Sequence, residues 1–124
     1  MGGHMKRILL VEDDIACLRT MKLVLQLEGY EVNIASDGDG ALLAFHNSSA
    51  KFDLVITDVQ MPRMSGIEFL SAIVTETCCP KILAMSGFFD QQTVGSLQAN
   101  GCTNYLKKPF NDQELLGVVS ELLK

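Results

Sequence analysis

Residues 54–66 carry the clearest structural signal in the chain, and they read Leu54-Val55-Ile56-Thr57-Asp58-Val59-Gln60-Met61-Pro62-Arg63-Met64-Ser65-Gly66. The first three residues form a short apolar run rich in β-branched side chains, which is typical of a strand buried on both faces of a parallel sheet. Pro62 and Gly66 belong to the loop that ends this strand, so Asp58 is expected at the strand's carboxyl end. In open α/β sheets, ligands bind at that edge.

Strand and helix patterns alternate along the whole chain. Strands are predicted at Arg7–Val11, Glu31–Ala35, Leu54–Asp58, Lys81–Met85 and Thr103–Leu106. Apolar residues at helical spacing and local stop signals predict five helices. They are expected at Ile15–Leu27, at Gly40–His46, from Gly66 to the stop at Cys78-Cys79-Pro80, around a core at Thr93–Ala99, and from Asn111 to Leu123. Five such units predict an α/β fold: a doubly wound, flavodoxin-like (βα)5 domain with five parallel strands in the order 2-1-3-4-5.

The predicted helices begin and end at recognisable residues. Asp14 precedes the first helix, and its side chain is expected to accept hydrogen bonds from the first turn. Asn111 precedes the last helix, with Glu114 placed three residues later as in a capping box. Gly29 and Gly101 are expected to end the first and fourth helices.

Length and composition describe one globular domain at residues 5–124, preceded by an apparent expression remnant at residues 1–4. The net charge of -5 offers no basic stripe for phosphates, so direct nucleic-acid binding is not expected. No apolar run approaches the roughly 18 residues of a membrane span, and no signal-peptide pattern is found. The four cysteines show neither zinc spacing nor a disulfide framework, which favours free thiols in a reducing cytoplasm.

Several polar side chains are expected to meet at one edge of this sheet. The acids Glu12, Asp13 and Asp58 come from the ends of the first and third strands. Ser86 follows the fourth strand and Lys108 follows the fifth. Crowded carboxylates repel one another, so such a cluster persists where a cation neutralises it. A few oxygen ligands suit Mg²⁺, with Mn²⁺ as an alternative, whereas zinc favours His or Cys.

These groups together are typical of phosphoryl-transfer chemistry. An Asp carboxylate can act as the nucleophile and become an aspartyl-phosphate. A metal ion, an ammonium group and a hydroxyl would then spread the charge on the transferring group. Taken singly, Lys108 fits a solvated surface lysine and Ser86 fits a turn residue. Their joint placement at the strand ends is what favours a functional site.

Four motifs resemble the receiver domain of bacterial two-component response regulators. The motifs are Val11-Glu12-Asp13-Asp14, residues 57–66, Met85-Ser86-Gly87 and Lys107-Lys108-Pro109-Phe110. The resemblance covers Lys6–Lys124 and departs from the commonest pattern at Glu12, where many members have Asp, and at Ser86, where Thr is common. It implies a cytoplasmic phosphoacceptor module that takes a phosphoryl group from a histidine kinase or phosphotransfer protein, and not an enzyme acting on free substrates.

The resemblance also implies a role for each acidic residue. Asp58 would accept the phosphoryl group. Asp13 and Asp58 would bind Mg²⁺ directly, together with the main-chain carbonyl of Gln60. Glu12 would act on the metal ion through a water molecule.

Further roles follow for the residues after the fourth and fifth strands. Ser86 and Lys108 would contact the phosphoryl group once it forms, as catalytic partners of Asp58. The Lys108–Pro109 peptide bond would be cis, which is uncommon in folded chains. Tyr105 would be an aromatic switch that turns inward as Ser86 moves. We hypothesise that Phe88 screens the acyl-phosphate from water and slows its hydrolysis.

The signal is expected to leave through the fourth helix. Its sequence contains β-branched residues and Gly95, which make it a poor helix former. We expect the face built from this helix, the last strand and the last helix to change on phosphorylation and to meet partners. Gln113, Gly117 and Glu121 fit the exposed side of that face, and each also fits ordinary solvated surface. A downstream effector domain or protein, and a monomer or weak homodimer, are both compatible with the sequence.

Three other interpretations stay open on the sequence alone. A haloacid-dehalogenase-type phosphatase also uses a nucleophilic Asp after a parallel strand, but it needs a second Asp where this chain has Gln60. A receiver-like docking module that takes no phosphate is disfavoured by the intact set of Asp13, Asp58, Ser86 and Lys108. In a flavodoxin-like cofactor binder, the acidic first loop would repel a phosphate.

Overall fold

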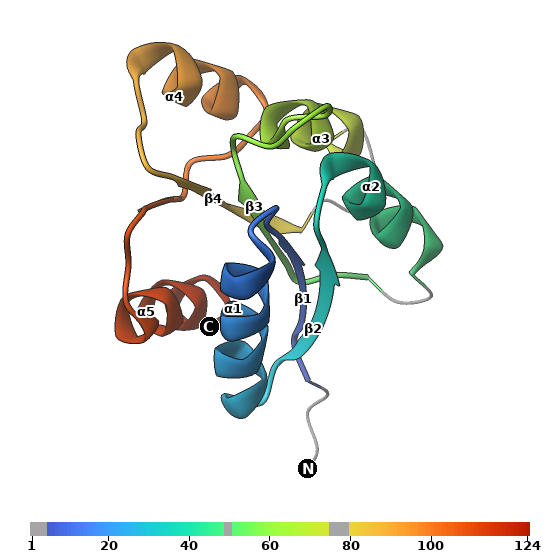
Figure 1. The fold of residues 1–124 in the computed structure, drawn as a ribbon, viewed down its shortest axis with the longest axis vertical. Helices are drawn as coiled ribbons and strands as arrows, with labels where there is room; N and C mark the ends of the chain where they lie inside the picture. The colour runs from blue at the N-terminus through green and yellow to red at the C-terminus, as the bar shows by residue number, and fades with distance from the viewer. Residues whose placement is uncertain (1–4, 49–50, 75–79) are drawn as a thin grey trace.

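The computed structural model describes residues 5–48, 51–74 and 80–124. Within these ranges, strands and helices alternate along the chain (Figure 1). The elements are β1 Arg7–Val11, α1 Ile15–Leu27, β2 Glu31–Ala35, α2 Gly38–Asn47, β3 Leu54–Asp58, α3 Gly66–Ile73, β4 Lys81–Ser86, α4 Gln91–Ala99, β5 Tyr105–Lys107 and α5 Asp112–Leu122.

The strands form one parallel sheet in the order β2-β1-β3-β4-β5, which confirms the predicted topology. The register pairs Val11 of β1 with Thr57 of β3, and Asp58 with Met85 of β4. The carboxyl ends of β1, β3 and β4 therefore lie side by side. This arrangement brings residues that are far apart in sequence to one edge of the sheet.

Helices cover both faces of the sheet. In Figure 1, α1 and α5 lie on one side, and α2, α3 and α4 lie on the other. Each face has its own apolar core, because successive strand side chains point to opposite faces. Leu9 packs with Phe69 and Leu97 on the α2–α4 side, whereas its neighbour Leu10 packs with Leu18 and Val119 on the α1–α5 side.

The helix caps follow the sequence prediction. Asp14 accepts a hydrogen bond from the Cys17 backbone N–H at the start of α1. Asn111 and Glu114 form a reciprocal capping box at the start of α5. Gly29 and Gly101 follow α1 and α4 with φ values of 93° and 78°, the left-handed conformation that glycine adopts most readily.

An aspartate caps each of two other helices. Asp37 accepts a hydrogen bond from the Gly40 N–H, so α2 begins at Gly38 and not at Gly40, because Gly38 belongs to the helix and not to the preceding turn. Asp90 accepts from the Thr93 N–H, so α4 begins at Gln91, two residues before the helix core predicted at Thr93–Ala99.

The last strand and two helix ends also differ from the prediction. β5 begins at Tyr105 and not at Thr103, because the Asn104 side chain, and not a strand N–H, donates to the Ile82 carbonyl of β4. α3 ends at Ile73, and α5 ends at Leu122, one residue earlier than predicted. The predicted stop at Cys78-Cys79 and the remnant at residues 1–4 lie outside the described residues. Among the described residues, no helix is long and apolar enough to cross a membrane.

Candidate functional site

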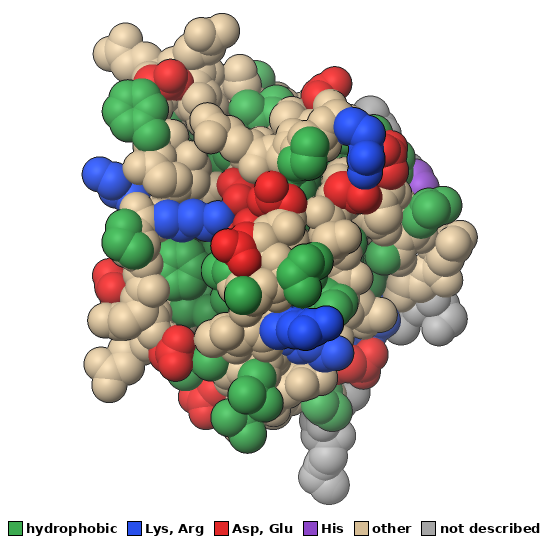
Figure 2. Space-filling model, in the orientation of Figure 1, with side chains coloured by type: hydrophobic (Ala, Val, Ile, Leu, Met, Phe, Trp, Pro, Cys, Tyr) green, Lys and Arg blue, Asp and Glu red, His purple; other side chains and the backbone are tan. Residues whose placement is uncertain are grey.

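The candidate site lies at the carboxyl edge of the sheet. Glu12 and Asp13 follow β1, Asp58 is the last residue of β3, and Lys108 follows β5. Figure 2 shows acidic side chains gathered near the middle of one face of the molecule, with a basic side chain beside them. The structure therefore brings together four of the residues that the sequence singled out.

Three carboxylates lie close enough to share one ion. Three carboxylate oxygens lie within 4.8 Å of one another, one each from Glu12, Asp13 and Asp58. Glu12 and Asp58 are buried, whereas Asp13 is exposed. A hard, all-oxygen donor set that is open on one side fits Mg²⁺, which binds to one or two carboxylates and keeps several water ligands. The residues present thus fit the ion that the family resemblance implies.

Lys108 bridges the two buried carboxylates. Its Nζ donates to Glu12 Oε1 at 2.5 Å and to Asp58 Oδ2 at 2.7 Å. Burial opposes the charge on Lys108, but the hydrogen bonds to Asp58 and Glu12 outweigh it and raise the lysine pKa above its ordinary value of 10.5. The ammonium group therefore stays charged and holds both acids near the mouth of the site.

Burial dominates the electrostatics of Glu12. It raises the pKa of this carboxyl from 4.5 to about 7, although the hydrogen bond from Lys108 acts in the opposite direction. Glu12 Oε2 also accepts a hydrogen bond from the Asp14 backbone N–H at 3.2 Å. The family resemblance implies that Glu12 acts on a metal ion through water, but the direct contact of Glu12 with Lys108 is not evident from the sequence.

Both carboxylate oxygens of Asp58 accept hydrogen bonds, which hold the side chain in place. Oδ1 accepts a hydrogen bond from the Gln60 backbone N–H at 3.1 Å, and Oδ2 accepts from Lys108. The chain then turns back so closely that a Cβ atom at Gly66 would overlap the Asp58 carbonyl oxygen. Glycine at position 66 therefore lets the loop return against the end of β3.

Ser86 is buried, but its hydroxyl is engaged with its own loop. Oγ donates to the Phe88 carbonyl at 2.9 Å and accepts from the Phe88 N–H at 3.1 Å. The Phe88 side chain is 66% exposed. In this conformation the hydroxyl is thus hydrogen-bonded to the loop between β4 and α4.

Tyr105 packs on the α2–α4 side of the sheet and is half-buried. Its ring centroid lies 5.3 Å from that of Phe89. Its hydroxyl donates to the Cys102 carbonyl at 3.1 Å. The ring therefore joins the loop that follows Ser86 to the start of β5.

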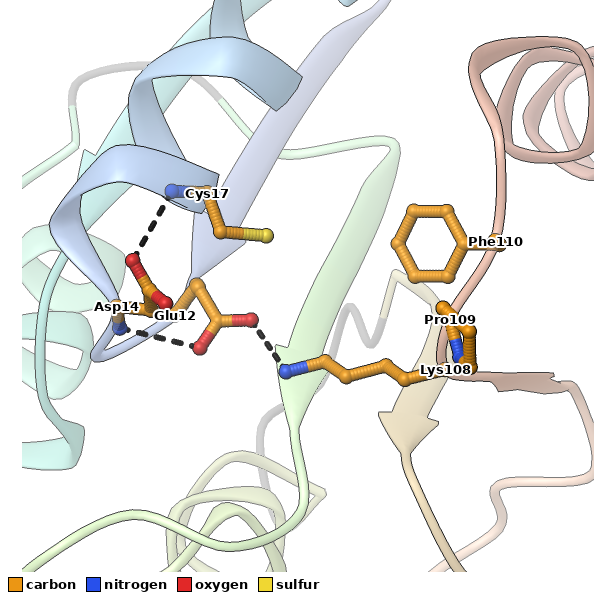
Figure 3. A pocket seen from close by; sticks show the side chains of 6 residues that line it. All are labelled: Glu12, Asp14, Cys17, Lys108, Pro109 and Phe110. Carbon is orange, nitrogen blue, oxygen red and sulfur yellow. Dashed lines mark hydrogen bonds and ion pairs between the residues drawn. The ribbon is translucent and has the colours of Figure 1, made fainter.

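A hollow of about 450 Å³ opens beside the acidic cluster (Figure 3). Lys108 extends across it toward Glu12, while Cys17 and Phe110 line its walls (Figure 3). The Lys108–Pro109 peptide bond is cis. The sequence analysis placed Lys108 at this edge but gave no signal that Cys17 or Phe110 would lie next to it.

One contact near the site was missed entirely. Arg63, in the loop after β3, pairs with Asp37 at the start of α2. The two residues are 26 positions apart, and each alone looks like an ordinary turn residue.

Comparison with known proteins defines the class. Residues 8–120 match the response regulator receiver domain family, and the chain belongs to that family. It is therefore a receiver domain, the phosphoacceptor signalling module of two-component systems.

Individual relatives show how far the similarity extends. The transcriptional regulatory protein CpxR of Escherichia coli (strain K12) is 36% identical over 120 residues, which are 97% of this chain and 50% of the relative. The two-component response regulator ARR10 of Arabidopsis thaliana is 34% identical over 118 residues, 95% of this chain and 21% of the relative. The structure of the Vibrio cholerae chemotaxis protein CheY4 matches with a TM-score of 0.90 at 34% identity and covers 97% of this chain and 100% of that one. The chain thus spans about half the length of CpxR.

Proposed function

We propose that Asp58 accepts a phosphoryl group from a phosphohistidine on a sensor histidine kinase or a phosphotransfer protein. The observation that carries the proposal is the position of its buried carboxylate. It lies 2.7 Å from the Lys108 ammonium group and within 4.8 Å of oxygens from Glu12 and Asp13. A nucleophile, a fixed cation and a divalent-ion donor set therefore meet at one point.

In this mechanism an Asp58 carboxylate oxygen attacks the phosphorus atom. A P–O bond forms, the P–N bond to the donor imidazole breaks, and the imidazole nitrogen leaves with the electron pair and takes up a proton. Mg²⁺ or Mn²⁺, held by Asp13, Asp58 and the Gln60 carbonyl and approached by Glu12, would neutralise charge on the transferring oxygens. Lys108 is poised to pair with the new phosphoryl group, since it already contacts Asp58 Oδ2.

The same step would switch the domain. Phosphorylation adds about two negative charges at the sheet edge. A hydrogen bond from Ser86 to the phosphoryl group would have to replace its present bond to the Phe88 carbonyl, which would release the loop before α4. Tyr105 would respond through its contact with Phe89, so α4, β5 and α5 form the proposed output face.

The relatives support a proposal about the setting of the domain. Because the chain covers half of CpxR, a transcriptional regulatory protein, we propose a downstream effector domain or protein, with no direct nucleic-acid binding by residues 5–124 themselves. We further propose a cytoplasmic location, as for response regulators generally, and a monomer or weak homodimer. Residues 5–124 would form the receiver domain, preceded by a remnant at 1–4.

Two of the rival interpretations, the phosphatase and the docking module, are not favoured. A haloacid-dehalogenase-type phosphatase needs a general acid two residues after its nucleophile, where Gln60 stands here. A docking module that takes no phosphate would not need Lys108 held between Glu12 and Asp58.

Acetyl phosphate tests the acceptor directly. The chain should gain the mass of one phosphoryl group with Mg²⁺ and none in EDTA, and peptide mapping should place it at Asp58. Asp58→Asn should abolish the gain, whereas Asp112→Asn, at an exposed acid in the first turn of α5, should not. Modification at another residue, or without a divalent ion, would contradict the proposal.

A further inference from the structure

The loop between Asp58 and Gly66 contains a residue in an unfavourable backbone conformation. Arg63 has a φ of 66°, the left-handed region that side chains other than glycine rarely adopt. Surrounding contacts must therefore hold the chain in this shape. The same loop carries Gln60, three residues earlier.

The contacts that hold Arg63 come from the start of α2. Its Nη2 lies 2.7 Å from Asp37 Oδ2, and its Nε lies 3.9 Å from Asp39 Oδ2. Asp37 is itself fixed, because its Oδ1 accepts the Gly40 N–H at 2.7 Å as the cap of α2. One carboxylate therefore caps a helix with one oxygen and binds the loop with the other.

Close packing reinforces this attachment. A Cβ atom at Gly38 would come within 2.7 Å of the Met64 carbonyl oxygen, so the loop lies directly against the first turn of α2. Both ends of the loop are held, since Val59 N–H donates to the Met85 carbonyl of β4 and Gly66 N–H donates to the Val59 carbonyl. The ion pair between Arg63 and Asp37 supports the outer part between these ties.

We propose that the Arg63–Asp37 ion pair is a positioning device that holds the loop, and with it the Gln60 main chain, in the shape that binds the divalent ion. This inference rests on the proposed function, since it concerns the same metal site. Arg63 and Asp37 act through the backbone and do not touch the ion.

The direction in which Mg²⁺ affinity changes when Arg63 is removed distinguishes a positioning role from a direct electrostatic effect. Arg63 is a cation near a cation site, so by Coulomb's law alone its removal tightens Mg²⁺ binding. If it positions the loop, its removal weakens Mg²⁺ binding instead. The two explanations predict opposite changes for one substitution.

The experiment is Mg²⁺ titration by calorimetry at constant ionic strength. Arg63→Gln keeps a non-glycine residue at this unfavourable φ, so it removes only the ion pair. It should raise the Kd for Mg²⁺ about threefold, which corresponds to the free energy of a well-placed exposed ion pair. Asp37→Asn keeps the helix cap and should weaken binding similarly. The double variant should bind no more weakly than the weaker single variant, because the pair acts as one unit. Arg63→Lys should recover part of the affinity.

A control and a second measurement complete the test. Lys124→Gln removes an equal charge from a pair at the end of α5 and should not weaken binding. In EDTA, amide hydrogen exchange at residues 60, 61, 63 and 64 should be faster in Arg63→Gln than in the unaltered chain. Mg²⁺ binding that is unchanged or tighter in Arg63→Gln overturns the inference alone. Absence of Mg²⁺ binding by the unaltered chain overturns it together with the metal part of the proposed function.

Discussion

At the residue scale, two opposing influences set the pKa of Glu12. Burial favours its neutral form, and Lys108 favours its charged form, with burial the larger of the two. The result is a carboxyl with a pKa of about 7 in the folded protein, above its ordinary 4.5. A group whose folded pKa is raised binds its proton more tightly in the native state, so it makes stability fall as pH rises between these values.

The metal-free protein should therefore be more stable at about pH 5.5 than at about pH 8, by on the order of 2 kcal/mol from Glu12. Lys108 does not contribute to the pH dependence of stability in this interval, because its pKa is raised above 10.5. Urea unfolding in EDTA at the two pH values measures the difference. Glu12→Gln should remove most of this difference in stability. A difference of equal size in that variant would contradict the assignment of the pH dependence to Glu12.

Phe88 offers a second prediction at this scale. Its backbone is hydrogen-bonded to Ser86 in the loop that would move on phosphorylation, and the residue is largely exposed. We predict that Phe88→Ala shortens the lifetime of the acyl-phosphate, because water reaches the phosphoryl group more easily. The decay of the phosphorylated mass peak measures this lifetime. An unchanged decay rate would show that the ring does not screen the group.

Single residues also show where sequence reasoning succeeds and fails. Asp58 and Lys108 could be placed from the sequence because each directly follows or ends a strand, and the strand order fixes which ends meet. The pairing of Arg63 with Asp37 could not be predicted, because it depends on how a loop folds back onto a helix start. No local pattern encodes that approach.

At the element scale, α4 is a poor helix former in sequence terms. Gly95 lies in its middle, where glycine costs about 1 kcal/mol relative to alanine. The prediction of a helix with its core at residues 93–99 was right, and the Asp90 cap fixes the start of this helix at Gln91. Start residues are hard to place where a loop aspartate can serve either as turn or as cap.

Gly95→Ala should stabilise the protein by about 0.5 to 1 kcal/mol, because nothing lies within 4 Å of the added Cβ atom. Gly38→Ala should destabilise it, since the new Cβ atom would meet the Met64 carbonyl at 2.7 Å. Denaturant midpoints of the two variants measure these changes. A stabilised Gly38→Ala would contradict the close packing at the start of α2, and a destabilised Gly95→Ala would contradict the open surroundings of Gly95 in α4.

At the scale of the whole molecule, the site exists because the sheet order places β1 beside β3. Strand patterns and right-handed crossovers predicted that order correctly, since nearly all-apolar strands require cover on both faces. The cost of the arrangement is carboxylate repulsion at one edge, which Lys108 relieves only for Glu12 and Asp58. Asp13 remains exposed beside them.

Asp13→Asn should therefore raise the melting temperature of the protein in EDTA slightly, because one repelling charge is lost. The same change should remove most of the stabilisation that Mg²⁺ gives to the unaltered chain. Thermal unfolding with EDTA and with Mg²⁺ measures both effects. Lower melting in EDTA, or an undiminished response to Mg²⁺, would count against a crowded, ion-sharing cluster.

Beryllofluoride binding, followed by amide NMR with and without Mg²⁺, tests most directly whether Asp58 is a metal-dependent phosphoryl acceptor. We predict binding only when Mg²⁺ is present, with shifts at Ser86 and Lys108 and along α4, β5 and α5, and no binding by Asp58→Asn. Binding without a divalent ion, binding retained by Asp58→Asn, or no binding by the unaltered chain would contradict it.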